Sequence, residues 1–239
     1  MASVSRQQYR AAVEKMLANY RDAEPIETKQ RLYRPVLIAH GWCAEVHRLA
    51  EAALKLLDLG YGHEATILLR TMFETTISLH WLYQKGEAGA EGVVTEGARQ
   101  NRAAAEDMET AFAPPPDVID AIKKTPVIQT EESRTFSKVM KQCDAIDPTK
   151  ALYSIYRYLC RFAHPTAASA DAFIEESMNP PHVRPTPKDR ESMVEVTSAM
   201  CLLWAGRAFD EMLNGKPRKR FLRAVAKEVQ LAPILPYIH

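Results

Sequence analysis

The sequence predicts an all-α protein, an up-down helical bundle with additional peripheral helices. Helical periodicity dominates the apolar positions, and alternating strand patterns are absent. The chain has 239 residues, 46% of them hydrophobic, so it is long enough to bury a sizeable core. We expect residues 1–239 to form a single all-helical domain. Its core bundle would span about 36–213, with a peripheral N-terminal helix at 5–21 and a peripheral C-terminal helical segment at 216–231.

Residues that favour helix ends separate the expected helices. Pro25 breaks the first helix, and Gly60 and Gly62 end the second. Gly86 and Gly89 are expected to form a loop after the third helix. The expected helices cover residues 5–21, from 28 or 35 to 59, 63–83, 91–112, 117–124, 132–143, 147–164, 188–213 and 221–231.

The helix that leads to His164 begins with a clear signal. Asp147 is expected to be the N-cap and Pro148 the first helical residue. Pro165 ends the helix, because the residue before a proline is disfavoured in the α conformation. A proline-rich loop is expected at 179–187. The four main helices of the bundle are expected to begin near Ala39, His63, Thr149 and Lys188.

Charge, hydropathy and cysteine content exclude several classes of protein. The formal net charge is +1, so a polyanion would have to bind a local patch. No segment is apolar enough to span a bilayer, and the N-terminus has no apolar signal core. We therefore expect a cytoplasmic protein with no membrane partner. The cysteines are expected to be free thiols, at Cys43, Cys143, Cys160 and Cys201.

The strongest candidate for chemistry is the pair Arg157 and His164. They are seven residues apart, so a helix would place both on one face, about two turns apart. In metal-independent phosphodiester cleavage, a histidine can deprotonate the ribose 2′-hydroxyl while an arginine stabilises charge on the phosphate. The structural alternative is that Arg157 pairs with a carboxylate of a neighbouring helix and His164 caps the helix end.

A second charged pair, Arg70 and Glu74, lies one turn apart between apolar residues. Because an uncompensated buried charge is costly, we expect the two to bond each other or a facing helix. The functional alternative is that they meet Arg157 and His164 across the bundle, where Glu74 would orient the imidazole or hold the arginine. The sequence thus predicts that four polar side chains converge between two helices.

Two further groups have a weaker claim to function. His40, Cys43 and His47 share a helix face and are residue types that suit zinc, but a fourth ligand is missing unless Glu51 supplies it. We favour packing between helices, and no metal or cofactor is expected. The basic run at 216–223 suits phosphates or an acidic partner, although a solvated surface is the favoured interpretation.

The segment from Arg157 to His164 resembles the motif of the HEPN superfamily, an arginine and a histidine separated by four to six residues, late in a small helical bundle. The resemblance implies a metal-independent endoribonuclease, or a toxin- or defence-type effector, whose site is completed by homodimerisation. It implies that Arg157 and His164 are catalytic, with Glu74 or Arg70 in support. RNA would be the substrate, and an antitoxin or regulatory protein is a candidate partner.

A second resemblance covers the chain from about Ala39 to Phe209. The pattern Glu64-Ala-x-x-Leu-Leu-Arg70-x-x-x-Glu74, followed later by Tyr153-x-x-x-x-x-Leu159-x-x-x-x-His164-Pro, is similar to a poorly characterised bacterial helical family of unknown function. This resemblance implies no activity. The alternative to an enzyme is a non-catalytic helical binding or regulatory protein, in which the inward polar residues set the helix register.

Overall fold

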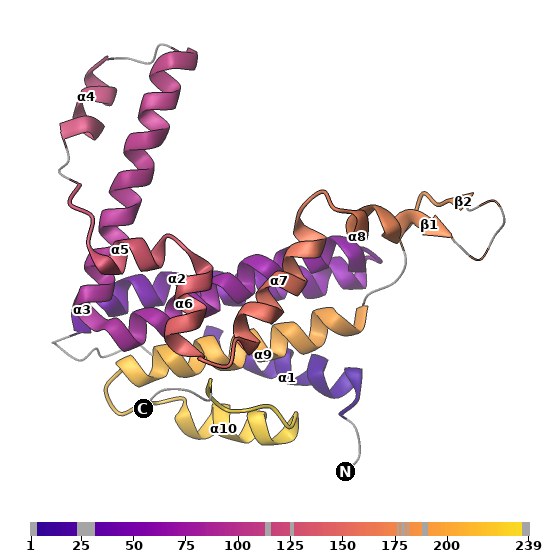
Figure 1. Ribbon diagram of the computed structural model, residues 1–239. Helices are drawn as coiled ribbons and strands as arrows, with labels where there is room; N and C mark the ends of the chain where they lie inside the picture. The colour runs from indigo at the N-terminus through magenta and orange to yellow at the C-terminus, as the bar shows by residue number, and fades with distance from the viewer. Residues whose placement is uncertain are drawn as a thin grey trace.

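The computed structural model describes residues 4–22, 32–112, 116–124, 127–175, 177, 180, 182–187 and 191–235. These residues are mostly helical, which confirms the all-α prediction. The helix starts expected at Thr28 and Lys188 lie outside them. The elements in Figure 1 are α1 (Arg6–Arg21), α2 (Tyr33–Asp58), α3 (Gly62–Phe112), α4 (Pro116–Lys124), α5 (Glu131–Phe136), α6 (Val139–Ile146), α7 (Ala151–Ala163), α8 (Ala167–Ala170), β1 (Ile174–Glu175), β2 (His182–Val183), α9 (Glu191–Met212) and α10 (Lys219–Glu228).

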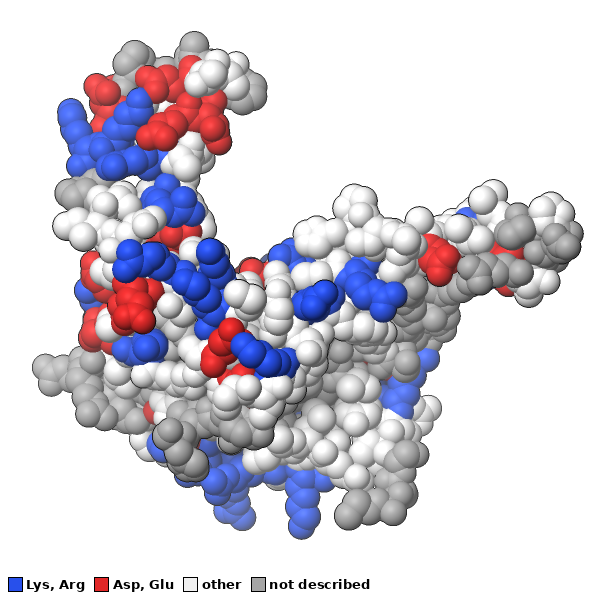
Figure 2. All heavy atoms as spheres, viewed as in Figure 1, with Lys and Arg blue, Asp and Glu red and all other residues white. Residues whose placement is uncertain are grey.

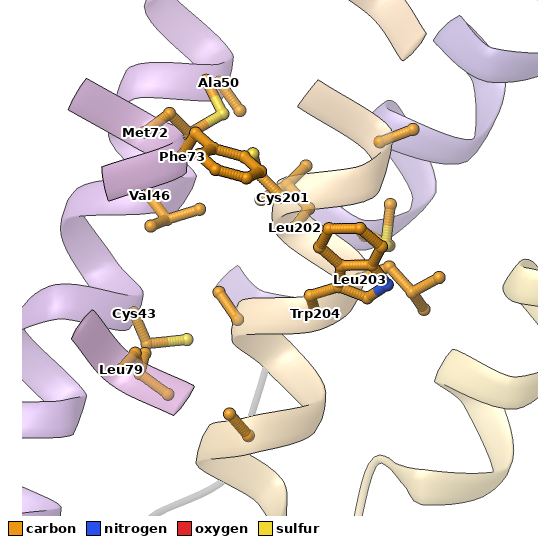
Figure 3. Packing of buried hydrophobic residues seen from close by; sticks show 14 of the residues in the cluster. Cys43, Val46, Ala50, Met72, Phe73, Leu79, Cys201, Leu202, Leu203 and Trp204 are labelled. Carbon is orange, nitrogen blue, oxygen red and sulfur yellow. The ribbon is translucent and has the colours of Figure 1, made fainter. Parts of the chain in front are cut away.

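The centre of the core lies between α2, α3 and α9. Figure 3 shows Val46 of α2, Phe73 of α3 and Leu202 of α9 among the side chains that meet there. All three are completely buried. Each comes from an apolar stripe that recurs every three or four residues, which is why helical periodicity predicts this part of the fold well.

The helix α1 was expected to be peripheral, but it forms part of this core. It packs along α9 and buries Ala12, Val13, Met16 and Leu17. The helix α7, expected among the four main helices, packs against α3 instead. The long helices at the centre are therefore α1, α2, α3 and α9, and α7 lies outside them on α3.

One long element, α3, combines two expected helices. Gly86 has φ 57° and ψ −131°, which are not helical values, so two helices meet at a kink there. The break expected at Gly86 is confirmed, but it is a kink at this one residue and not a loop that extends to Gly89. Glycine reaches this positive φ because it has no Cβ. Beyond the bend, Gly92 lies so close to α5 that a Cβ there would be 2.7 Å from the Cβ of Glu132. The end of α3 then projects from the body together with α4 (Figure 1).

The helix α7 begins three residues later than predicted. Its first residue is Ala151, because Lys150 has a left-handed φ of 66°. Asp147 still caps the helix, but from further back along the chain. Its carboxylate accepts hydrogen bonds from the backbone N–H of Thr149 at 2.8 Å and of Leu152 at 3.0 Å.

Two other segments differ from the prediction. The helix expected at 132–143 is divided into α5 and α6, which meet at a turn. The loop expected at 179–187 contains β2, which pairs antiparallel with β1 so that Ile174 lies opposite Val183. Strands of two residues are too short to show an alternating pattern, so periodicity could not reveal them.

All four cysteines are free thiols, as predicted. Burial raises the pKa of Cys143 and of Cys201 to about 12, so both thiols stay protonated near neutral pH. Across the described ranges of the chain, the structure has no helix with the length and apolar character needed to cross a membrane.

Candidate functional site

Helix α7 has an apolar side and a charged side. Leu152, Leu159 and Phe162 are buried where the helix packs on the body of the protein. Arg157 is exposed, as is Arg161 one turn later. The helix therefore presents its cations to solvent while its apolar stripe fixes it in place.

His164 lies just beyond the end of α7. The helix ends at Ala163, and His164 is an exposed C-cap residue with φ −125° and ψ 156°. Pro165 accounts for this extended conformation, because its ring clashes with an α-helical preceding residue. The helix was expected to include both Arg157 and His164, but it includes only Arg157 and ends one residue before His164.

The described part of the chain offers no side-chain partner to Arg157 or to His164. Among the residues that the structure describes, no hydrogen bond, ion pair or ring contact involves either side chain. The structural alternative for Arg157, a carboxylate partner on a neighbouring helix, thus has no support in this part of the chain. Its other half agrees with the position of His164, which is the C-cap residue of α7.

Arg70 and Glu74 meet each other on α3, as expected from their spacing. Arg70 Nη2 lies 3.1 Å from Glu74 Oε2, and the two side chains are 26% and 35% exposed. They are partly buried charges that compensate each other, which is the arrangement that burial requires.

Arg70 also ties α3 to α7. Its Nη2 donates a hydrogen bond to the hydroxyl of Tyr156 at 3.0 Å, and its Cζ lies 5.6 Å from the centre of that ring. The bond to Tyr156 raises the pKa of Arg70, and burial raises the pKa of Tyr156. The contact therefore joins a charged guanidinium to a neutral phenol.

The four predicted site residues are not joined into one cluster. Arg70 and Glu74 reach α7 at Tyr156, and no hydrogen bond or ion pair in the described parts of the chain links them to Arg157 or His164. Since a helix turns about 100° per residue, a Tyr156 that faces α3 leaves Arg157 directed toward solvent. The convergence predicted between two helices is replaced by a contact through the neighbouring tyrosine.

Tyr156 is a residue that the sequence analysis missed. A signal for it existed, because Tyr153, Tyr156 and Cys160 recur every three or four residues and all three are half-buried. This spacing forms a second stripe beside the apolar one. The stripe indicates where α7 contacts a neighbour, although it does not say which residue lies opposite.

The solvent side of α7 combines positive charge with an exposed aromatic ring. Tyr158 is 49% exposed, and the Cζ of Arg161 lies 6.0 Å from its ring centre. No acidic residue occurs between Asp147 and Asp171. In Figure 2, blue side chains stand out from a white surface over α7. Cations beside a stackable ring are typical of surfaces that bind single-stranded nucleic acid.

His40, Cys43 and His47 lie on α2 in different surroundings. His40 is exposed, whereas Cys43 and His47 are buried and His47 stacks on Tyr20 with ring centres 3.9 Å apart. Burial raises the pKa of Cys43 to about 11 and lowers the pKa of His47 to about 4. Over the described residues, no group of three or more His, Cys, Asp or Glu side chains could hold a metal ion.

A set of buried charges on α9 was also missed. The buried carboxylate of Asp210 accepts hydrogen bonds from Arg207 Nη1 at 3.1 Å and from the backbone N–H of Arg218 at 2.9 Å. Glu211 accepts a bond from Arg207 Nη2 at 2.5 Å and pairs with Lys216. Arg207, Asp210 and Glu211 have the spacing of helical ion pairs near the end of a mostly apolar helix, which was the available signal.

This network corrects the interpretation of the basic run at 216–223. Arg218 is 9% exposed, and its Cζ lies 5.4 Å from the ring centre of Tyr20 and 5.6 Å from that of Phe209. The solvated-surface interpretation is therefore wrong for Arg218. It holds for Arg220 and Arg223, which are exposed.

Comparison with known proteins places the chain in a family. Residues 36–180, more than half of the chain, match the model of a family of unknown function, DUF5677. The match runs from α2 to β1 and includes all four predicted site residues: Arg70, Glu74, Arg157 and His164. No curated protein and no solved structure matches the chain significantly. The chain therefore belongs to DUF5677, a family whose function is unknown.

Proposed function

We propose that this protein is a metal-independent endoribonuclease that acts as a homodimer, with Arg157 and His164 as its catalytic residues. The observation that carries the proposal is the state of these two side chains. Both are exposed, and neither has a partner among the described residues that would account for it by a structural role. An accessible guanidinium and an accessible imidazole are the groups that phosphodiester cleavage without a metal requires.

The proposed reaction is an internal transfer of the phosphodiester. His164 takes the proton of a ribose 2′-hydroxyl, and the 2′-oxygen forms a bond to the phosphorus. The bond from phosphorus to the 5′-oxygen of the next nucleotide breaks, and that oxygen takes up a proton from solvent. Arg157 stabilises the negative charge on the phosphate oxygens. The products are a 2′,3′-cyclic phosphate and a 5′-hydroxyl.

Arg70 and Glu74 are positioning residues in this proposal. They touch α7 through Tyr156 rather than through the reacting groups. Their contribution is to hold α7 on α3, so that the side of the helix with Arg157 faces the RNA. Tyr158 and Arg161 extend this side with a ring and a second cation that suit an unpaired base and its phosphate.

The test is incubation of the purified full chain with single-stranded RNA in the presence of a chelator. We expect cleavage that His164→Ala and Arg157→Ala each reduce by about 100-fold or more, the usual contribution of an acid–base group. Mass spectrometry of the fragments should show cyclic phosphate ends. Matched controls are His182→Ala and Arg223→Ala, which remove an exposed histidine and an exposed arginine elsewhere. Equal cleavage by wild type and His164→Ala, or none by either, contradicts the proposal.

A non-catalytic binding or regulatory module is the second candidate. It is favoured by the contact that Arg70 and Glu74 make, since two of the four expected site residues then serve the packing of α7. In that case the wild type leaves RNA intact in the same assay, and His164→Ala changes binding or stability without changing turnover.

A toxin- or defence-type role follows from the nuclease if the cell restrains it with an antitoxin or regulatory protein. Expression of the wild type should then arrest growth, whereas His164→Ala at the same protein level should not. If both proteins arrest growth, the toxicity does not depend on RNA cleavage by His164.

A further inference from the structure

The outer side of α2 carries a groove of about 690 Å³. Among the described residues, those that line it include the small residues Gly41, Ala44 and Ala52, with Arg48 between the two alanines. The distance between two packed helices depends on the side chains at their contact, so small residues allow a second helix to come close. The opposite side of α2 is already occupied by the core.

Charged residues along this groove alternate in sign. Glu45, Arg48, Glu51 and Lys55 follow one another at intervals of three or four residues, and all four line the groove. If a second copy of the helix lies antiparallel to the first, each charged residue of one copy faces a residue of opposite charge in the other. Glu45 then meets Lys55, and Arg48 meets Glu51, in exchange for the ion pair that Lys55 and Glu51 form at 2.8 Å within one chain. A helix with this order is complementary to an antiparallel copy of itself.

Exposed apolar side chains lie at both ends of the same helix. Tyr33 and Leu37, in its first turns, are 58% and 55% exposed. Leu59 and Tyr61, just beyond its last residue, are 72% and 54% exposed. An antiparallel arrangement brings the first pair of one copy toward the second pair of the other.

We propose that two copies of this chain associate through the outer side of α2, with the two helices antiparallel about a twofold axis. A twofold interface uses the same patch on both subunits, so the patch must be complementary to itself. The charges in the middle set the register, and the apolar ends supply buried area. The inference rests on the homodimer of the proposed function, but it places the interface on α2 and not at Arg157 and His164, and it requires no RNA cleavage.

The test uses two double variants with opposite charge. Arg48→Glu with Lys55→Glu makes all four positions acidic, and Glu45→Lys with Glu51→Lys makes all four basic. Light scattering after size-exclusion chromatography should give twice the mass of one chain for the wild type and the mass of one chain for each variant. A 1:1 mixture of the two variants should recover the dimer, because opposite charges then meet across the interface.

A matched control is Arg223→Glu with Lys227→Glu, the same change in charge on the exposed side of α10, which should leave the dimer intact. Circular dichroism checks that each variant is folded. A further variant, Leu37→Glu, tests the apolar ends without changing the charged middle, and should raise the dissociation constant at least tenfold.

A monomeric wild type overturns the inference, and so does a dimer that survives in both charge variants and in Leu37→Glu. A mixture that stays monomeric overturns the antiparallel pairing. Because oligomeric state is measured without RNA, loss of the dimer and loss of cleavage are separate results.

Discussion

The charges of α9 and the charges of α7 differ in what surrounds them. On α9, Asp210 is completely buried and bonded to both Arg207 and the backbone of Arg218. On α7, Arg157 and the adjoining His164 are exposed, and no described residue bonds to either side chain. A buried charge that is bonded to its neighbours is explained by the fold that it holds together. An exposed cation and imidazole without partners need another explanation, which is why the proposed function starts from α7.

The contact between Arg70 and Tyr156 lies between these extremes. It is partly exposed, it joins two helices, and it is made by a charged donor to a neutral acceptor. It contributes to the packing of α7 without the desolvation that Asp210 undergoes. Three substitutions or conditions should therefore give graded effects on stability.

The largest effect is expected for Asp210→Ala. Removing this carboxylate leaves the buried guanidinium of Arg207 with less compensating charge and the N–H of Arg218 without its acceptor. Breaking a buried ion pair from one side typically costs about 3–5 kcal/mol. Urea unfolding followed by circular dichroism measures the free energy of unfolding.

The matched control is Asp58→Ala. Asp58 forms two hydrogen bonds with Arg10, at 2.7 and 2.8 Å, but its side chain is 53% exposed. Exposed ion pairs contribute no more than about 1 kcal/mol. Equal losses for Asp210→Ala and Asp58→Ala would show that burial is not what distinguishes the α9 network.

A second prediction concerns the buried histidines. His80 Nε2 lies 3.0 Å from the carbonyl oxygen of Trp204, and burial, opposed by this bond, lowers the pKa of His80 to about 4. Burial likewise lowers the pKa of His47 to about 4. Between pH 6.5 and 4 the unfolded chain binds protons at these histidines that the folded chain does not. The free energy of unfolding is therefore unaffected by the two histidines above about pH 6.5 and falls as the pH is lowered.

The expected loss at pH 5 is about 2 kcal/mol for each of the two histidines, relative to pH 7. Urea midpoints across this range measure the loss, and NMR titration of the imidazole resonances assigns it to His80 and His47. His182→Ala, a change at an exposed histidine, should show the same pH profile as the wild type. An unchanged midpoint between pH 7 and 5 would mean that the unfolded and folded chains bind protons alike.

Much of the fold was predictable, because helix ends and apolar stripes are local features. Gly60 ends α2 as expected, with φ 83° just after the helix. Gly86 misled only in the length of the break, because its positive φ interrupts the helix as a kink at one residue rather than as a loop. Asp147 misled in a similar way, since its carboxylate caps a helix that begins four residues later. Both errors concern residues whose local preference allows two outcomes.

Contacts of the candidate site within one helix could be predicted from the sequence, whereas contacts between helices could not. The spacing of Arg70 and Glu74 was enough to predict their ion pair, because both lie on one helix. The bond from Arg70 to Tyr156 joins residues 86 positions apart, and it depends on how α7 packs on α3. The exposure of Arg157 follows from the same packing, so it needed the structure.

The smallest effects on stability are expected on α7, where a substitution on the side that packs on α3 can be compared with one on the exposed side. Tyr156→Phe removes the hydroxyl that Arg70 bonds, and should cost about 1 kcal/mol, the usual worth of a hydrogen bond to a partly buried group. Arg157→Ala, one residue further along, should change the free energy of unfolding by no more than about 0.5 kcal/mol.

The order of the two variants should be reversed for RNA binding, so that Arg157→Ala has the larger effect and Tyr156→Phe the smaller one. If Arg157 contacts a phosphate, Arg157→Ala should lower by about one the slope of the logarithm of affinity against the logarithm of salt concentration, whereas Tyr156→Phe should leave that slope unchanged. Fluorescence anisotropy with labelled single-stranded RNA gives both slopes. A larger loss of stability for Arg157→Ala than for Tyr156→Phe would mean that Arg157 holds the fold, and the contrast between α7 and α9 would no longer point to function.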